Sequence, residues 1–155
     1  MTYRVSEIFA SVQGEGVRAG LGALFVRFAG CNLDCSFCDT EQRDNVRLEV
    51  SLDELLEYAA AVLDEHNIQH VVLTGGEPML QVDLPLIEAL LERVTTVQIE
   101  TNGTAGIDPV LDMEMQQSDR IWVTWSPKMP LRAVHHVDEM KVLYPTPWGE
   151  DPADL

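Results

Sequence analysis

Residues 30–40 read Gly30-Cys31-Asn32-Leu33-Asp34-Cys35-Ser36-Phe37-Cys38-Asp39-Thr40 and contain all three cysteines of the chain. This C-x3-C-x2-C spacing can bring three thiolates to one [4Fe–4S] cluster and leave the fourth iron without a protein ligand. A structural zinc site would need a fourth Cys or His, and His66 and His70 come much later. Disulfides need pairs, whereas the number of cysteines is odd. The stretch therefore favours an iron–sulfur cluster with an open iron over zinc, disulfides or three buried thiols.

The chain has 155 residues, enough for one domain, and is strongly acidic. Ten Lys and Arg against 26 Asp and Glu give a formal charge of −16, which repels nucleic acid and anionic lipid surfaces. The apolar runs are far shorter than the roughly 18 residues that a membrane-spanning helix needs. The opening residues, Met1-Thr2-Tyr3-Arg4, show no charged-then-apolar leader. We therefore expect a cytoplasmic protein that contacts neither nucleic acid nor membranes.

Short apolar or β-branched runs alternate with helical patterns along the chain. The expected strands, buried on both faces, are residues 23–28, 70–73, 97–100, 121–124 and 140–143. One helix is expected after Ser51, which forms a capping box with Glu54, and a second over 84–91, with Pro85 in its first turn. This alternation predicts an α/β fold with a mostly parallel sheet and right-handed crossovers. A partial (β/α) barrel is the natural extension of that arrangement.

Polar or glycine-rich clusters follow four of the expected strands. They are residues 30–31, 74–78, 100–104 and 126–128. Ligands of parallel α/β folds bind at the carboxyl ends of the strands, so these clusters would meet at one edge of the sheet. Each cluster alone could be an ordinary turn. Together, beside a loop with three cysteines, they predict the walls of one site.

These residues resemble the radical S-adenosylmethionine (SAM) superfamily. Cys31, Cys35 and Cys38 match its cluster motif, Phe37 occupies the aromatic position before the last cysteine, and residues 74–78 match its Gly-Gly-Glu-Pro motif. The resemblance implies a radical SAM partial barrel in which the three cysteines hold a [4Fe–4S] cluster. It also implies that SAM binds the open iron and yields a 5′-deoxyadenosyl radical.

The same resemblance implies which residues contact SAM. They are Phe37, Gly75, Gly76, Glu77, Glu100, Asn102, Ser126 and Lys128. Gly75 and Gly76 suit this role because a strand edge without Cβ atoms can approach the amino group of SAM closely. Glu77 is expected to brace its loop more than to bind directly.

The N-terminal third is similar to the 7-carboxy-7-deazaguanine synthase family of queuosine and other 7-deazapurine pathways. The matching segments are residues 8–16, 25–33 and 38–40, within a similarity that runs from residue 3 to 143. The resemblance implies a lyase that rearranges 6-carboxy-5,6,7,8-tetrahydropterin into 7-carboxy-7-deazaguanine, releases ammonia and regenerates SAM.

A substrate site follows from this resemblance. It comprises Val12, Gln13, Gly14, Glu15, Gly16, Arg27 and Thr74. Gln13 and Glu15 can read the hydrogen-bonding edge of a pterin, and Arg27 can clamp its carboxylate. From the residues alone, the alternative for 13–16 is a surface turn between strands, and the alternative for Arg27 is a salt bridge on a strand face. Thr40 matches a Mg²⁺ contact of the family, for which a hydroxyl oxygen is suitable, and Asp39 is expected to support the loop.

The domain organisation and partners are also expectations from the resemblance. Residues 1–144 would form the radical SAM domain, and 145–155, rich in proline and acidic residues, would be a poorly ordered or truncated end of a shortened C-terminal part. A homodimer and a flavodoxin- or ferredoxin-type reductant are implied. Two other functions stay open. One is an activase that makes a glycyl radical on a protein partner. The other is an iron–sulfur electron carrier, although carriers normally fill all four ligand positions.

Overall fold

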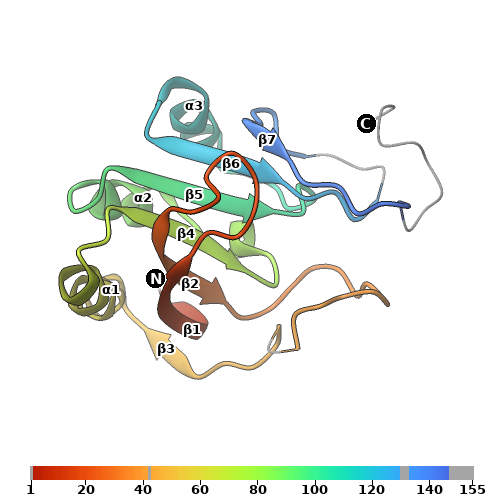
Figure 1. Ribbon diagram of the computed structural model, residues 1–155. Coiled ribbons are helices and arrows are strands. Elements are labelled where there is room, and N and C mark those ends of the chain that lie inside the picture. Colours follow the sequence, from red (N-terminus) through yellow and green to blue (C-terminus); the bar gives the residue numbers. More distant parts are fainter. Residues whose placement is uncertain (1, 42, 130–132, 147–155) are drawn as a thin grey trace.

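The computed structural model describes residues 2–41, 43–129 and 133–146, which form a seven-stranded sheet and helices (Figure 1). The strands are β1 (Tyr3–Val12), β2 (Gly22–Phe28), β3 (Leu48–Val50), β4 (His70–Gly75), β5 (Thr96–Thr101), β6 (Ile121–Trp125) and β7 (Glu139–Met140). The helices are α1 (Leu52–His66), α2 (Leu84–Leu91) and α3 (Pro109–Gln117), with a short 3-10 helix η1 (Pro78–Leu80). The strand order is β3-β1-β2-β4-β5-β6-β7.

The sheet is mostly parallel, as the sequence predicts. Strands β2, β4, β5, β6 and β7 pair in parallel, and β1 runs antiparallel to both β2 and β3. The first four expected strands are confirmed as β2, β4, β5 and β6. The expected strand at 140–143 is wrong, because β7 covers only Glu139–Met140. Its neighbour β6 ends at Trp125, whose carbonyl oxygen accepts from the Lys141 N–H, and among the described residues the strand pairing does not continue beyond this point.

Both expected helices are confirmed, and their first turns show why they begin where they do. The Ser51 hydroxyl accepts from the Glu54 backbone N–H (3.3 Å), while Glu54 accepts from the Ser51 N–H (2.8 Å). Asp83 caps α2 by accepting from the Leu86 N–H (3.1 Å), and it also accepts from the Tyr3 hydroxyl (2.7 Å). The cap of α2 is therefore tied to the first strand.

Three elements were not expected from the sequence. Strand β3 is only three residues long. In β1 the only buried apolar residues are Tyr3 and Val5, with Arg4 between them, so neither strand has a clear apolar pattern. In α3 only Leu111 and Met115 are buried, one turn apart, which is too little for a periodic signal.

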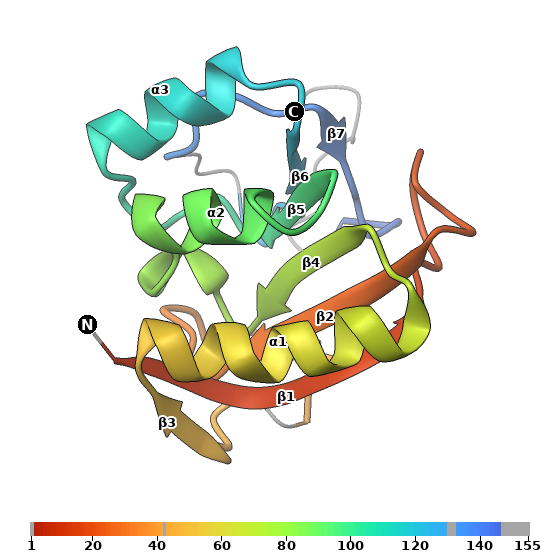
Figure 2. The same ribbon diagram turned by 90° about the vertical axis from the view of Figure 1, so that its left-hand side faces the viewer.

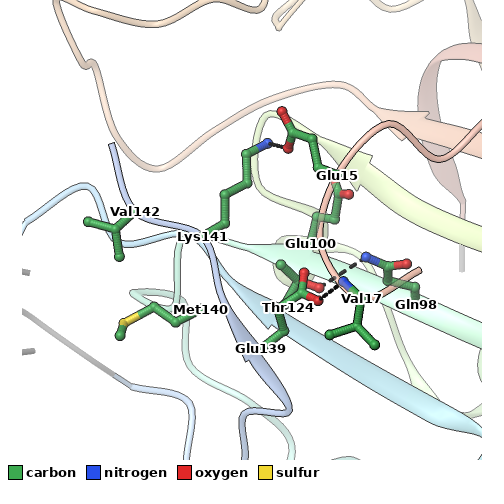
Figure 3. A pocket seen from close by; sticks show the side chains of 10 residues that line it. Glu15, Val17, Gln98, Glu100, Thr124, Glu139, Met140, Lys141 and Val142 are labelled. Atoms are coloured by element: carbon green, nitrogen blue, oxygen red, sulfur yellow. Dashed lines mark hydrogen bonds and ion pairs between the residues drawn. The ribbon is translucent and has the colours of Figure 1, made fainter. Parts of the chain in front are cut away.

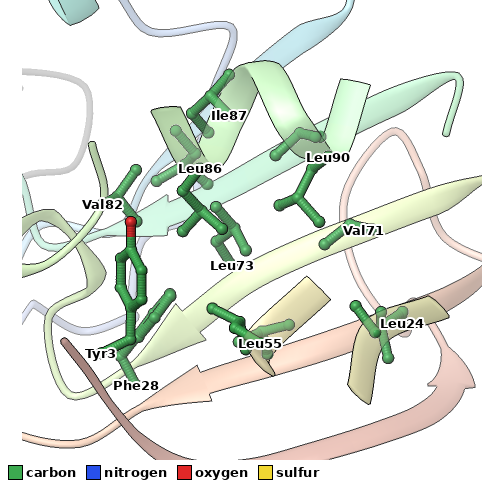
Figure 4. Close-up of a cluster of buried hydrophobic side chains, with 14 of the residues drawn as sticks. Tyr3, Leu24, Phe28, Leu55, Val71, Leu73, Val82, Leu86, Ile87 and Leu90 are labelled. Carbon is green, nitrogen blue, oxygen red and sulfur yellow. The ribbon is translucent and has the colours of Figure 1, made fainter. Parts of the chain in front are cut away.

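The three helices lie along one face of the sheet (Figure 2). Their apolar sides meet the strands in one core, in which Leu24, Phe28, Leu55, Leu73 and Leu86 are almost fully buried (Figure 4). The loop between β1 and β2 crosses the opposite face of the sheet, in front of β5 and β6 (Figure 1). Because this core fixes the central strands, it also fixes the positions of their carboxyl ends.

Within these residues no helix has both the length and the apolar character needed to cross a lipid bilayer. The expected poorly ordered end falls mainly on residues 147–155, which lie outside the described residues. The division at residue 144 stays a prediction.

His70 is a buried titratable group in the middle of the sheet. Its Nδ1 lies 2.7 Å from Thr96 Oγ1, and its Nε2 lies 3.1 Å from Gln98 Oε1. The Gln98 amide donates to Thr124 Oγ1 (3.0 Å), so its oxygen faces the ring and Nε2 carries the proton of a neutral imidazole. Burial lowers the pKa of His70, and the Arg18 charge adds to that shift.

We predict that His70 makes the fold less stable as the pH falls below about 6.5, the pKa of an unperturbed histidine. In that range the unfolded chain binds a proton that the folded chain excludes, so the loss grows until the pH reaches the lowered pKa. Urea unfolding between about pH 5 and about pH 7 measures this slope. His70→Gln, which does not titrate, should flatten it. Equal slopes for both proteins would contradict the prediction.

Candidate active site

The carboxyl ends of β2, β4, β5 and β6 surround a cavity of about 460 Å³, here called the rim cavity. The clusters expected at the four strand ends therefore do meet at one edge of the sheet. Expected site residues that line the rim cavity are Arg27, Cys31, Cys35, Phe37, Cys38, Thr40, Thr74, Gly75, Gly76, Glu100, Asn102, Ser126 and Lys128.

All three cysteines line the rim cavity. Burial raises the pKa of Cys35, and the neighbouring thiols of Cys31 and Cys38 raise it further, while Lys128 acts in the opposite direction. The described part of the chain contains no group of three His, Cys, Asp or Glu side chains that could hold one metal ion. A cubic cluster does not need such a group, because each thiolate binds a different iron. The three thiols therefore fit a cluster, whose positive irons would also relieve their mutual repulsion.

Gly75 and Gly76 lie against the backbone that leads into the cysteine loop. A Cβ on Gly75, whose φ is +137°, would lie 2.1 Å from the Phe28 carbonyl oxygen, and one on Gly76 would lie 2.2 Å from that of Gly30. The Gly76 N–H donates to Phe28 O (3.1 Å), and the Glu77 N–H donates to Gly30 O (2.9 Å). The glycines are thus required for close packing between the end of β4 and the backbone of residues 28–30. From the sequence, we expected them only to allow SAM to approach closely.

Glu77 lies behind the rim cavity and is completely buried. Its carboxylate accepts from the Met79 N–H (3.0 Å), the Thr101 hydroxyl (2.6 Å) and the Asn102 N–H (2.7 Å). Burial raises the pKa of the Glu77 carboxyl group. The three hydrogen bonds oppose this shift but do not cancel it. Glu77 therefore joins the end of β4 to the end of β5, the geometry of a brace.

Asn102 connects β5 to the cysteine loop. Its Oδ1 accepts from the Thr104 N–H (2.8 Å) and hydroxyl (2.7 Å), and its Nδ2 donates to Asn32 Oδ1 (3.1 Å) and lies 3.9 Å from Cys31 Sγ. The amide thus uses both acceptor and both donor positions within the protein. A contact between this side chain and SAM requires that one of these partners be replaced.

Positive side chains are concentrated at the rim cavity. Four of the ten Lys and Arg residues line it, namely Arg27, Arg43, Lys128 and Lys141. Lys128 donates to Ser126 Oγ (2.7 Å), and burial lowers its pKa, with a further lowering from Lys141. On a chain with a formal charge of −16, these four cations distinguish the rim cavity from the acidic exterior, although Asp39 and Glu100 line it as well.

Glu100 is held from two sides. It accepts from Gln13 Nε2 (3.0 Å) at one carboxylate oxygen and from Thr74 Oγ1 (3.1 Å) at the other. Gln13 is buried by this arrangement, which argues against a simple surface turn. Val12 and Gly14, also expected at the substrate, line neither the rim cavity nor the cavity beside it.

Arg27 forms an ion pair with Glu7 (2.9 Å) across β1 and β2. This is the strand-face salt bridge that the sequence left open, although Arg27 also lines the rim cavity. Thr40 lines it as well, with its hydroxyl 3.4 Å from Asp39 Oδ1.

A second cavity of about 500 Å³, here called the side cavity, lies beside the first (Figure 3). Glu15 and Gly16 line it, and it shares Glu100, Thr124 and Lys141 with the rim cavity. No sequence pattern pointed to Lys141 or Arg43, because a single basic residue without a motif is usually a surface residue. The fold alone reveals their positions.

The comparisons with known proteins agree with this geometry. Residues 25–120 match the Radical SAM superfamily. A 7-carboxy-7-deazaguanine synthase of Bacteroides thetaiotaomicron is 41% identical over 93% of this chain and 71% of its own length. That of Nitratidesulfovibrio vulgaris is 42% identical over 94% of this chain and 72% of its own. The crystal structure of QueE from Escherichia coli has a TM-score of 0.66 and 32% identity, covering 91% of this chain and 71% of that one.

These similarities extend over most of the chain, so they concern the whole fold and both cavities. They confirm the radical SAM type of partial barrel that the cysteine loop and the Gly-Gly-Glu-Pro segment predict. The chain belongs to the radical SAM superfamily and, within it, to the 7-carboxy-7-deazaguanine synthase family.

Proposed function

We propose that this protein is a radical SAM lyase that converts 6-carboxy-5,6,7,8-tetrahydropterin to 7-carboxy-7-deazaguanine and ammonia. The observation that carries the proposal is the rim cavity, which joins three cysteines to the ends of β4, β5 and β6 in a chain similar to named synthases. The reaction loses one ammonia and involves no net oxidation. A hydrogen removed from the substrate can therefore be returned within the same turnover.

Cys31, Cys35 and Cys38 would hold the [4Fe–4S] cluster. Around it, Phe37, Gly75, Gly76, Glu100, Ser126 and Lys128 would bind SAM, because all of them line the rim cavity. When bound, the reduced cluster and SAM supply a 5′-deoxyadenosyl radical. Lys128 is suited to the carboxylate of SAM, since its ammonium is already oriented by Ser126.

The substrate would lie between the β1–β2 loop and the end of β5. Glu100, held by Gln13 and Thr74, can accept from the donor groups of a pterin ring. Arg27 can bind the substrate carboxylate after it leaves Glu7, and the Thr40 hydroxyl would contact Mg²⁺. The enclosing side chains orient the ring and reduce its contact with water.

We further propose a cytoplasmic homodimer that takes its electron from a flavodoxin- or ferredoxin-type protein. The acidic composition supports the absence of direct nucleic-acid and membrane contacts. Sedimentation of the reconstituted protein tests the dimer.

The test of function is anaerobic turnover. Reconstituted protein receives dithionite, SAM, Mg²⁺ and 6-carboxytetrahydropterin, and mass spectrometry follows both the pterin product and 5′-deoxyadenosine. Formation of 7-carboxy-7-deazaguanine, absent without reconstitution, supports the proposal. Deoxyadenosine without this product would contradict the substrate assignment and favour another radical SAM reaction, such as glycyl-radical activation. A redox-active cluster with neither species would favour an electron carrier.

A further inference from the structure

Lys141 stands at the junction of the two cavities. It follows β7, lines both the rim cavity and the side cavity, and forms an ion pair with Glu15 (Figure 3). Burial would lower the pKa of Lys141, but its hydrogen bond to Glu15 and the carboxylate of Glu100 outweigh that effect and raise it. The ammonium is therefore retained as a charge inside the site.

Glu15 is a member of the segment proposed to read the pterin edge. In this structure one oxygen of its carboxylate is held by Lys141, so the full carboxylate can turn to a substrate only if this ion pair opens. The side chains of the pair are only partly buried, at 40% exposure for Lys141 and 58% for Glu15. A partly exposed ion pair contributes little to stability, so a ligand can exchange it at little cost.

The other basic groups of the rim cavity have partners outside the β1–β2 loop. Arg27 is paired with Glu7, Lys128 is directed at Ser126, and Arg43 binds Asp34 and Asp44 beside the cysteine loop. Lys141 differs from these three because its partner, Glu15, belongs to the β1–β2 loop, beside which the substrate is proposed to lie. When Glu15 turns to a ligand, the Lys141 ammonium is left within the site without that counter-charge.

We propose that Lys141 is a specificity-determining residue that exchanges Glu15 for the carboxylate of the substrate. This inference rests on the proposed function. The incoming carboxylate replaces Glu15 as the counter-ion of Lys141, in addition to the contact with Arg27 proposed above, since both basic residues line the rim cavity. The released Glu15 accepts hydrogen bonds from the donor edge of the ring. A ligand that carries both an anionic group and a donor edge satisfies both residues. A ring without the carboxylate cannot replace Glu15 at Lys141. Lys141 then competes with the ring for the Glu15 carboxylate.

A second contact holds the loop during this exchange. The Val17 N–H donates to Glu139 Oε2 (2.7 Å), on the strand that precedes Lys141. Because Gln13 is also fixed on Glu100, the loop stays in place on both sides of Glu15. The exchange then requires only side-chain movement.

The test measures binding without turnover. Reconstituted protein with SAM and Mg²⁺, but without reductant, is dialysed against 6-carboxypterin or against pterin, the same ring without the carboxylate. Mass spectrometry of the two chambers gives the affinity for each. Lys141→Met should weaken 6-carboxypterin by about tenfold or more, because a charge-assisted hydrogen bond is lost, and should leave pterin within about twofold. Lys141→Arg should keep most of the preference.

Glu15→Gln is the matched control on the other side of the ion pair. It should weaken pterin, because the contact with the ring is lost, and weaken 6-carboxypterin less, because the Lys141 ammonium no longer has Glu15 as a competing counter-ion. The affinity ratio should therefore move towards the carboxylate, opposite to its movement in Lys141→Met. An unchanged ratio in Lys141→Met and in a second neutral variant, Lys141→Gln, would overturn the inference while leaving the proposed function intact. Failure of the unmodified protein to bind either pterin would instead count against the proposed function, and this inference would fall with it.

Discussion

Gly76→Ala is expected to abolish assembly of the iron–sulfur cluster. A Cβ at this position would lie 2.2 Å from the Gly30 carbonyl oxygen, 2.6 Å from the Gly30 carbonyl carbon and 3.0 Å from Cys31 Cβ. These are mostly backbone atoms, which cannot turn aside as a flexible side chain can. The β4 loop or the cysteine loop must therefore move, at a cost of roughly 1–3 kcal/mol. Movement of the cysteine loop displaces Cys31 from Cys35 and Cys38, and movement of the segment after β4 removes the hydrogen bond from the Glu77 N–H that holds Gly30 beside Cys31.

Iron and sulfide content per chain after reconstitution measures the effect, together with the EPR signal of the reduced cluster. Gly106→Ala is the matched control, since a Cβ there would meet no atom within 4 Å. This control should bind iron as the unmodified protein does. A Gly76→Ala protein with full iron content and an unchanged EPR signal would show that the two loops are not closely coupled.

Glu77→Ala is expected to cause the largest loss of stability, about 3 kcal/mol or more. The substitution leaves the Met79 N–H, the Asn102 N–H and the Thr101 hydroxyl without their acceptor, and each buried unpaired donor costs about 1–3 kcal/mol. Glu77→Gln should lose less, because one amide oxygen remains as an acceptor while its NH₂ group faces a donor.

Urea unfolding of the two variants gives these free energies. Glu57→Ala serves as the control, because Glu57 is an exposed carboxylate on α1. It should change stability by less than about 0.5 kcal/mol. If Glu77→Ala were as stable as this control, the buried carboxylate would not brace the ends of β4 and β5.

Local patterns in the sequence predicted the framework of the site. The cysteine spacing, the capping box at Ser51 and the short β-branched strands are each contained in a few neighbouring residues, so they can be recognised without the fold. Because parallel strands end at one edge, the positions of the strand-end clusters also followed from local information.

Interactions between distant segments could not be predicted in the same way. The pair of Lys141 with Glu15 joins the last described segment to the first loop, and neither residue has a local pattern that implies the other. The packing of Gly76 on Gly30 likewise depends on the β2–β4 register. Strand β7 was misplaced because strand length depends on the neighbouring strand as well as on the apolar run.

The concentration of positive side chains at the rim cavity has a kinetic consequence. At physiological ionic strength a charge acts over a distance of about 8 Å, so an approaching molecule responds mainly to the surface nearest to it. A small monoanion that reaches the cavity mouth meets Lys128, which donates to Ser126 and not to a carboxylate, and its capture should slow as salt is added. Arg27, Arg43 and Lys141 can add to this attraction only as they leave their carboxylate partners. A long polyanion must lie along the acidic exterior as well, so added salt should ease its approach. The opposite signs of these two salt dependences would let the protein distinguish a small acidic ligand from a nucleic acid.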